Sequence, residues 1–177
     1  MKCGSIGEVY VDDLFASMYD EYFDDVYRYV YVKTGNKWDA EDIVSDTFRK
    51  AYEKFSSLQE GTKFKSWLMT IARNNVMDFY RKKKGVLVGE NIELYCTPIQ
   101  FEDSLEQSDE MDCLKKSLDY LPKEDMEIVN LRYFADLKFK DIAAILQKQD
   151  TSIRVKATRI LKKMGLLLEK CLGGNND

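Results

Sequence analysis

The sequence contains no histidine, and its four cysteines are widely spaced. The absence of histidine excludes His-based catalytic triads and the usual His-containing zinc sites. Cys3, Cys96, Cys113 and Cys171 form no CxxC pair, so a metal site built on cysteine alone would need distant ligands to converge. A glycine-rich phosphate-binding loop of the Walker or dinucleotide type is also missing. The sequence therefore gives little support to an enzyme, and we expect no metal and no cofactor.

Long uncharged apolar stretches are absent as well, which bears on where the protein works. We expect no membrane-spanning segment and no secretory signal, because the first residues lack an apolar core. With cysteines so far apart, we also expect no disulfide framework and a reducing, cytoplasmic environment. The 177 residues suit one medium domain or two small ones, with ample apolar content for a core.

Charge is unevenly distributed along the chain, although the net charge is only −4. Acids dominate 1–48 and bases dominate 49–84, whereas every charge in 85–112 is negative and every charge in 151–168 is positive. Two separate basic stretches on an acidic protein are typical of a polyanion binder that also has a second partner. Ordinary charge scatter is the alternative, and two clean basic helices disfavour it.

Apolar residues recur at helical spacing through the first half and predict three helices. The first covers 12–33, and Gly35-Asn36 is its stop signal. The second begins near Asp39, which we expect to be its N-cap. A polar loop over 56–62 then leads to a third helix over 64–84. Three helices with short connections make a compact helical domain.

The helix over 64–84 has two unlike faces. The face expected in the core comprises Phe64, Trp67, Leu68, Ile71, Ala72 and Phe79. The polar stripe comprises Thr70, Asn74, Asp78 and Arg81, and four cations end the helix at 81–84. Amides, cations and aromatic rings can grip phosphates and stack on bases. The alternative is an amphipathic helix with a solvated basic end, in which Asp78 and Arg81 simply pair along the helix.

The second half has the pattern of a linker followed by a helix-turn-helix. Residues 85–109 show no sustained period and carry only negative charge. A helix over 111–121 is followed by a second helix, with Pro122 in its first turn. Then come a short apolar helix, a tight turn over 147–150 and a basic last helix. Inward positions of that last helix are Ile153, Ala157, Ile160, Leu161, Met164 and Leu168. Outward positions are Ser152, Arg154, Val155, Lys156 and Arg159. Any helical hairpin with a basic surface is the alternative.

Motifs in both halves match one known family. In the first half they are Phe15-x-x-x-Tyr19-x-x-Tyr22, the segment 39–52, and Phe64-x-x-Trp67-Leu-x-x-Ile71-Ala-Arg-Asn74-x-x-x-Asp78-x-x-Arg81. In the second half they are Leu121-Pro122, Val129-x-Leu131-Arg-Tyr133 and Phe139-Lys-Asp-Ile142-Ala143-x-Ile145-Leu146. These resemble regions two and four of bacterial RNA polymerase sigma factors, most closely the small extracytoplasmic-function (ECF) group. The match covers nearly everything except the linker and the ends.

The resemblance implies an all-α protein made of two small helical domains joined by a linker. Residues 1–84 would form sigma region 2, a three-helix bundle that binds core polymerase and the −10 promoter element. Residues 85–110 would be the acidic linker. Residues 111–177 would form sigma region 4, whose helix-turn-helix binds the −35 element.

The resemblance also implies roles for individual residues. Contacts to the clamp helices of the largest polymerase subunit are expected from Asp39, Asp42, Asp46, Arg49 and Lys50. Contacts to the opened −10 strand, with a base held in a protein pocket, are expected from Lys63, Lys65, Arg73, Asn74, Asp78, Arg81, Lys82 and Lys83. Contacts to duplex −35 DNA are expected from Ser152, Arg154, Val155, Lys156 and Arg159.

The chain departs from the family pattern at the turn and at the start of the last helix. Gln147 stands where the family usually has glycine, and Thr151-Ser152 stands where it has Gly-Thr. Val155 stands where serine is common, and it can touch a thymine methyl group but cannot hydrogen-bond a base. These departures bear on the DNA sequence preference of region 4.

The function implied by the resemblance is that of an ECF sigma factor, with no catalytic residues of its own. It would direct core RNA polymerase to promoters and help to open the DNA. Expected partners are the clamp helices, the flap of the second large subunit, promoter DNA and an anti-sigma factor, often membrane-bound. A helix-turn-helix regulator acting alone and a protein-binding helical adaptor are the rival hypotheses. The adaptor explains the acidic face but leaves the two basic helices unexplained.

Overall fold

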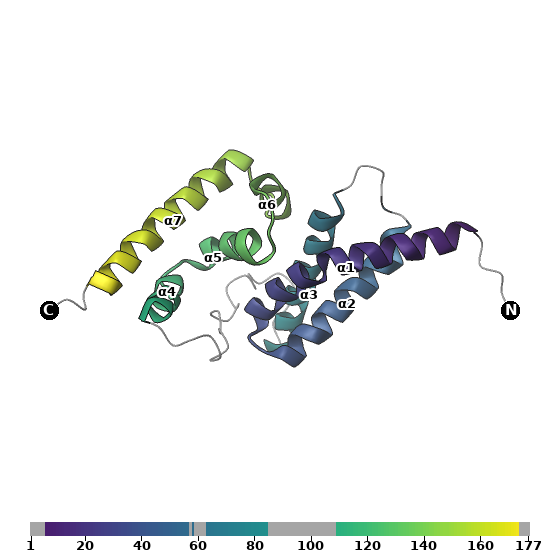
Figure 1. Ribbon diagram of the computed structural model, residues 1–177, viewed down its shortest axis with the longest axis horizontal. Helices are drawn as coiled ribbons and strands as arrows, with labels where there is room; N and C mark the ends of the chain where they lie inside the picture. Colours follow the sequence, from purple (N-terminus) through teal and green to yellow (C-terminus); the bar gives the residue numbers. More distant parts are fainter. Residues whose placement is uncertain (1–5, 57, 59–62, 85–108, 174–177) are drawn as a thin grey trace.

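The computed structural model describes residues 6–56, 58, 63–84 and 109–173, and all regular secondary structure in these ranges is helical (Figure 1). The helices form two groups, one from each half of the chain, which confirms the all-α expectation. Most of the expected linker, and part of the loop over 56–62, lie outside the described residues.

The first group consists of α1 (Ile6–Thr34), α2 (Lys37–Phe55) and α3 (Phe64–Lys84). After α1, Gly35 adopts a φ of 63°, a left-handed conformation that glycine tolerates, and its N–H donates to the Tyr31 carbonyl at 2.8 Å. The N-cap of α2 is Asn36, whose side-chain oxygen accepts from the Asp39 N–H at 3.1 Å. The expectation that Asp39 caps α2 is therefore wrong, because the helix already begins at Lys37.

The core of the first group forms where α3 packs against both α1 and α2. Its deeply buried side chains include Val26, Tyr29 and Val30 of α1, Val44 and Thr47 of α2, and Leu68, Met69, Ala72 and Val76 of α3. The inward face of α3 is rotated from the expected one, since Met69, Val76 and Tyr80 are buried while Trp67, Ile71 and Phe79 are half-buried. Because both α1 and α2 pack against α3, they cover a wider part of its surface than the single apolar stripe expected from the sequence.

A hydrogen-bonded pair of polar side chains lies inside this core. The Thr47 hydroxyl donates to the Ile43 carbonyl at 2.7 Å and accepts from the Asn75 amide at 2.9 Å. Both side chains are buried, so leaving either without a partner would cost about 1–3 kcal/mol. The hydrogen bond between Thr47 and Asn75 fixes the register of α2 against α3, because a shift of either helix would break it.

The second group consists of α4 (Asp109–Asp119), α5 (Lys123–Val129), a π-helical turn η2 (Asn130–Phe134), α6 (Phe139–Ile145) and α7 (Asp150–Gly173). The wide turn closes with the Ala135 N–H donating to the Asn130 carbonyl at 3.1 Å. Two residues with positive φ mark the bends: Asp136 at 48° before α6 and Gln147 at 53° before α7. The short helix, the turn and the long last helix thus have the expected helix-turn-helix order.

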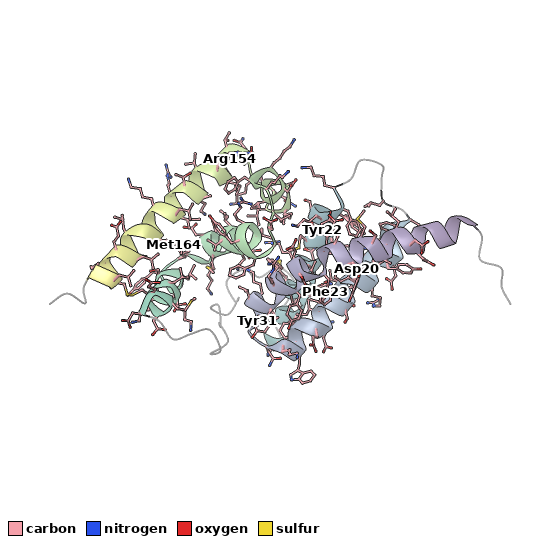
Figure 2. All side chains as sticks on the ribbon, viewed as in Figure 1. Asp20, Tyr22, Phe23, Tyr31, Arg154 and Met164 are labelled. Carbon is pink, nitrogen blue, oxygen red and sulfur yellow. A yellow bond between two sulfur atoms is a disulfide. The ribbon has the colours of Figure 1, made fainter. Side chains whose placement is uncertain are left out.

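Helix α7 is buried mainly through its first half. Ile153, Ala157 and Ile160 are buried as expected, and Met164 packs partly against the core (Figure 2). Leu161 is 50% exposed, so the expectation that it faces inward is wrong. Its position next to Ile160 turns it about 100° away from the buried line of a 3.6-residue helix.

A disulfide joins Cys113 of α4 to Cys171 of α7, with their Cα atoms 5.7 Å apart. The expectation that wide spacing argues against disulfides is therefore wrong for this pair. Spacing in the sequence measures only the loop between two cysteines, whereas the antiparallel packing of α4 on the end of α7 brings them together.

The two groups touch each other through α1 against η2 and through α3 against α6 (Figure 1). Between them lie charged side chains from both halves of the chain.

Candidate functional site

A network of charges runs along the outer face of α2. Arg49 pairs with Asp46 and, at 2.6 Å, with Glu53, while Lys50 pairs with Asp46 at 2.7 Å. Lys50 also donates to Asn75 of α3 at 2.6 Å. Partial burial would raise the pKa of Asp46, but Lys50 and Arg49 outweigh it and hold that pKa below its usual value. Exposed pairs of this kind contribute little to stability, so they can exchange for groups of a partner.

The five residues expected to contact polymerase all lie on this helix. Asp39, Asp42, Asp46, Arg49 and Lys50 follow one another at spacings that keep them on neighbouring helical turns. Asp42 is exposed, and Asp39 accepts a 3.4 Å contact from Lys83 of α3. The structure therefore brings the expected set together as one acidic-to-basic surface.

The polar stripe on α3 is present as expected. Asn74 is exposed, and Asp78 forms an ion pair with Arg81 one turn further on, as the simple-pairing alternative anticipated. The Arg81 Nε is buried and has no hydrogen-bond partner among the described residues. Lys82 and Lys83 are exposed, and the Lys83 ammonium lies 5.1 Å from the centre of the Phe79 ring.

Three of the expected −10 contacts instead meet the second group of helices. Lys63 pairs with Asp141 of α6 at 2.5 Å. Lys65 pairs with Asp25 of α1 at 2.6 Å and donates to the Asp136 carbonyl at 3.1 Å. Arg73 is the third, and its side chain is only 14% exposed. In this arrangement Lys63, Lys65 and Arg73 are engaged by carboxylates of the protein itself, whereas Lys82 and Lys83 at the end of α3 are exposed.

Arg73 reaches Glu127 of α5, a residue that the sequence analysis missed. Glu127 accepts from the Arg73 Nε at 3.3 Å, from the Tyr29 hydroxyl at 2.9 Å, and from Lys33. Burial would raise the pKa of Glu127, but Lys33, Arg73 and Tyr29 together hold it below its usual value. No local pattern could have found this cluster, because its members lie far apart in the sequence and meet only when the two groups pack.

Helix α7 presents the second expected surface. Ser152, Arg154, Val155 and Arg159 are exposed on its first half, and Lys156 is partly exposed. In the turn before α7, Gln147 adopts a left-handed conformation, which glycine adopts most readily. A non-glycine residue therefore makes this bend. The outward set expected from the sequence is brought together as one face.

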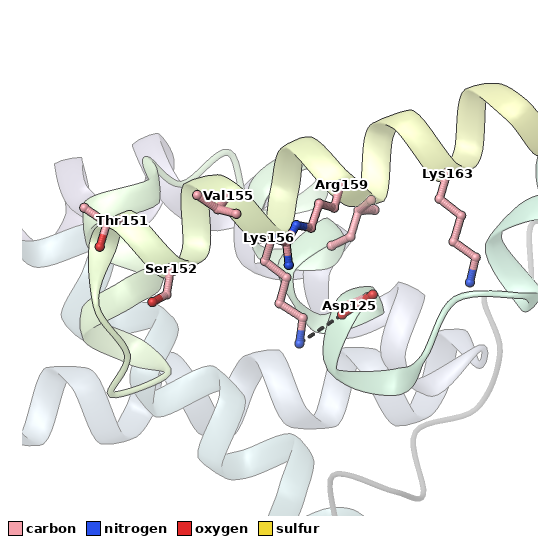
Figure 3. A pocket seen from close by; sticks show the side chains of 8 residues that line it. Asp125, Thr151, Ser152, Val155, Lys156, Arg159 and Lys163 are labelled. Atoms are coloured by element: carbon pink, nitrogen blue, oxygen red, sulfur yellow. Dashed lines mark ion pairs between the residues drawn. The ribbon is translucent and has the colours of Figure 1, made fainter.

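Two cations of this face are held by neighbouring side chains. Lys156 bridges Glu124 and Asp125 of α5, each at 3.0 Å. Figure 3 shows the pair with Asp125. Burial would lower the pKa of Lys156, but hydrogen bonds to these two carboxylates raise it above its usual value. Arg154 pairs with Asp150 at 3.0 Å, and its guanidinium carbon lies 5.5 Å from the centre of the Phe139 ring.

An open groove of about 570 Å³ lies along this face, between α7 and the start of α5 (Figure 3). Its wall carries Thr151, Ser152, Val155, Lys156, Arg159 and Lys163, with Asp125 opposite. Hydroxyls and cations facing one groove suit a polyanion that also offers hydrogen-bonding edges, as duplex DNA does.

Other kinds of site find no support in the part of the chain that the structure describes. Among these residues no group of histidine, cysteine, aspartate and glutamate is arranged to hold a metal ion. No helix within the described ranges combines the length and apolarity needed to cross a membrane.

Comparison with protein families gives two matches in the order of the two helical groups. Residues 18–86 match the model of sigma-70 region 2, and residues 111–164 match that of sigma-70 region 4. The first match contains α2 and α3 with their charged faces, and the second contains the helix-turn-helix and the outward face of α7.

Individual relatives agree with these matches. ECF RNA polymerase sigma factor BldN of Streptomyces coelicolor is 32% identical over 160 residues, which cover 88% of this chain and 61% of BldN. RNA polymerase sigma factor SigV of Bacillus subtilis is 31% identical over 146 residues, covering 82% of this chain and 86% of SigV. Sigma factor RpoE of Bartonella quintana, solved in complex with the anti-sigma factor NepR, has a TM-score of 0.63 and 26% identity, covering 88% of this chain and 96% of RpoE.

Fold and surface together define a helical protein with a helix-turn-helix for DNA. The chain belongs to the RNA polymerase sigma factors of the sigma-70 family, within the ECF group, whose function is to direct promoter-specific transcription initiation.

Proposed function

We propose that this sigma factor divides promoter recognition between α3 and α7 and grips core RNA polymerase through α2. The observation that carries the proposal is the outward face of α7: Ser152, Arg154, Val155 and Arg159 are exposed on the helix that follows the turn. In a helix-turn-helix this is the helix that enters the major groove. The chain has no catalytic role of its own in this proposal.

The −35 element would be read from this face in duplex DNA. Arg159 and Arg154 carry guanidinium groups that can form paired hydrogen bonds with guanine, and Val155 can contact a thymine methyl group. Lys156 is held by Glu124 and Asp125 and would contact a phosphate only by exchanging these partners. Ser152 lies near the start of the helix, where its hydroxyl can reach either a base edge or a phosphate.

The −10 element would be captured as an opened strand by α3. Asn74, Asp78 and Arg81 offer amide, carboxylate and guanidinium groups on one stripe, followed by exposed Lys82 and Lys83. Extruding a base costs a few kcal/mol, which hydrogen bonds to its edge and contacts to its phosphates can return. Lys63, Lys65 and Arg73 would join them only after leaving Asp141, Asp136 and Glu127.

Core RNA polymerase would bind the charged surface of α2 that comprises Asp39, Asp42, Asp46, Arg49 and Lys50. The partner on this side would be the clamp helices of the largest subunit, and region 4 would also meet the flap of the second large subunit. An anti-sigma factor is a further partner in this proposal, supported by the Bartonella quintana RpoE structure, which contains one. The site of action would be the cytoplasm, with the protein held at the membrane when that anti-sigma factor is anchored there.

The test is reconstituted transcription on fragments of bacterial genomic DNA. Core polymerase alone should give background initiation, and adding the purified chain should give start sites that share one −10 and one −35 sequence. Background initiation on all fragments, combined with tight duplex binding by the chain alone, would instead support a regulator that acts without polymerase.

A further inference from the structure

The second group of helices contains a cysteine pair that promoter recognition does not use. Cys113 lies in the middle of α4 and is 5% exposed, and Cys171 lies in the last turn of α7, where it is partly exposed. Their Cα atoms are 5.7 Å apart, within the range that a disulfide spans without moving the backbone. We propose that this pair is a reversible modification site for low-molecular-weight disulfides and thiols, which sets how firmly α4 is held against α7.

Apart from the cysteine pair, the two segments contribute partly buried apolar side chains such as Leu114 and Met164, and few fully buried ones. The three buried residues that α7 contributes, Ile153, Ala157 and Ile160, all lie in its first half. Beyond them Leu161, Leu166 and Leu172 are 50%, 59% and 40% exposed.

The contribution of α4 is equally small. It buries Cys113, Ser117 and Leu118, so one of its three buried side chains is a partner in the disulfide itself. A hydrogen bond from Lys163 to the Tyr120 carbonyl, at 3.1 Å, adds a polar contact at an exposed position. With so few buried apolar side chains, a covalent link supplies a large part of the attachment.

The chemistry balances with a small disulfide as the oxidant. The Cys171 thiolate, the more exposed of the two, attacks one sulfur of the small disulfide, forms a mixed disulfide and releases one small thiolate. The Cys113 thiolate then attacks the Cys171 sulfur, which forms the internal disulfide and releases the second thiolate. The protein loses two electrons and two protons, the small disulfide becomes two thiols, and an excess of thiol reverses both steps.

The cross-link acts at a distance from the DNA-facing side chains. Cys171 lies twelve residues after Arg159, which at 1.5 Å per residue is about 18 Å along the helix. Oxidation therefore leaves the outward face of α7 uncovered and changes only the order of α4 and of the second half of α7. The attachment of α4 becomes dependent on the thiol–disulfide balance around the protein.

The test uses the full chain with Cys3→Ser and Cys96→Ser, so that only the proposed pair can react. Incubation with oxidised glutathione should remove two hydrogens from the protein mass and leave no bound glutathione. Hydrogen exchange of amides in 109–119 and 161–173 should become roughly tenfold slower than in the reduced form, while 153–160 stay unchanged. A stable glutathione adduct without the internal disulfide, or equal exchange in both forms, would overturn the proposal.

A second variant separates loss of the link from loss of folding. Adding Cys171→Ser alters only a partly exposed position near the helix end, so the fold should remain. This variant should show the exchange of the reduced form whether or not oxidised glutathione is present. Slow exchange in 161–173 without the second sulfur would show that packing alone holds the segment, against the proposal.

Discussion

The cations on the outward face of α7 differ in how available they are. Arg154 is engaged by Asp150 and the Phe139 ring, and Lys156 by Glu124 and Asp125. Arg159 forms no ion pair with any residue in the described ranges and lines the open groove. A cation that need not leave another partner contributes more to binding per contact, so Arg159 should be the main DNA contact of this face.

Arg159→Ala should therefore weaken binding of the holoenzyme to −35 duplex DNA by about 1–3 kcal/mol, because one guanidinium contact is lost. If that contact is to a phosphate, the slope of log affinity against log salt should fall by about one. Titration of labelled promoter fragments at several salt concentrations measures both. Lys162→Ala, on the same helix but outside the groove, is the matched control, and an equal loss there would contradict the assignment.

Asp42 allows a second test at the residue scale, because it is exposed and no ion pair with other described residues engages it. Asp42→Lys should weaken binding to core polymerase roughly tenfold. The reason is that a positive side chain would repel the polymerase group that the Asp42 carboxylate attracts in this proposal. Asp13→Lys makes the same charge change at an exposed position of α1 and should bind core normally. Equal affinity of both variants in a core pull-down titration would remove Asp42 from the polymerase-binding surface.

At the scale of elements, the two turns of the second group carry conformational cost. Gln147 has a φ of 53°, where an L-residue other than glycine costs about 1–2 kcal/mol and glycine costs almost nothing in the folded state. Glycine also loses more freedom on folding, by about 0.5–1 kcal/mol. The conformational cost of Gln147 at this φ is larger than the entropy cost of a glycine there, so glycine would make this turn more stable.

Gln147→Gly should raise the free energy of unfolding by about 0.5 kcal/mol, the difference between these two costs. Lys148→Gly, one position later and without a positive φ, should lower it by about 0.5–1 kcal/mol. Urea titration of both variants, followed by circular dichroism, gives the comparison. Destabilisation of similar size at both positions would show that the bend at Gln147 carries no strain.

The elements themselves could be largely predicted from the sequence, whereas their exact faces could not. Helical spacing predicted α2, α3, α6 and α7, because each has an apolar side that must be covered. It misplaced the inward face of α3, which two neighbours enclose, and put Leu161 inside. Asn36 was missed as the N-cap because Gly35-Asn36 was assigned to the end of the preceding helix, whereas α2 already begins at Lys37.

At the scale of the whole molecule, Glu127 joins the two groups of helices. It lies between Lys33 and Tyr29 of α1 and Arg73 of α3, so residues from two helices depend on one carboxylate of α5. Contacts of this kind could not be predicted, because no local sequence pattern specifies how the two halves of the chain pack against each other. The Cys113–Cys171 pair escaped prediction for a related reason, as only the packing of α4 on α7 brings its members together.

Glu127→Gln should loosen the packing of the two groups by roughly 3 kcal/mol, because a neutral amide replaces the carboxylate that faces the Lys33 ammonium, which is only 6% exposed. Small-angle scattering should then report a larger radius of gyration at neutral pH. Glu110→Gln, at an exposed position of α4, should leave the radius unchanged. An unchanged radius in both variants would show that Glu127 does not hold the groups together.

The lowered pKa of Glu127 gives the same contact a definite pH dependence. A carboxyl whose pKa is lower in the packed state adds stability above its unperturbed pKa and loses it as pH falls towards the lowered value. The parent chain should therefore expand in acid, starting below about pH 4.5. The Glu127→Gln variant should lack this transition in the same scattering series, and a transition of equal size there would assign it to other carboxylates.

The central claim is that one chain reads two promoter elements with two separate helices. Its most direct test is run-off transcription by the holoenzyme on a promoter mutated separately at −10 and at −35, with the parent chain, Asn74→Ala and Arg159→Ala. Asn74→Ala should lose sensitivity to −10 changes only, and Arg159→Ala should lose sensitivity to −35 changes only. If both variants respond to both mutations as the parent does, the assignment of α3 and α7 to the two elements is wrong.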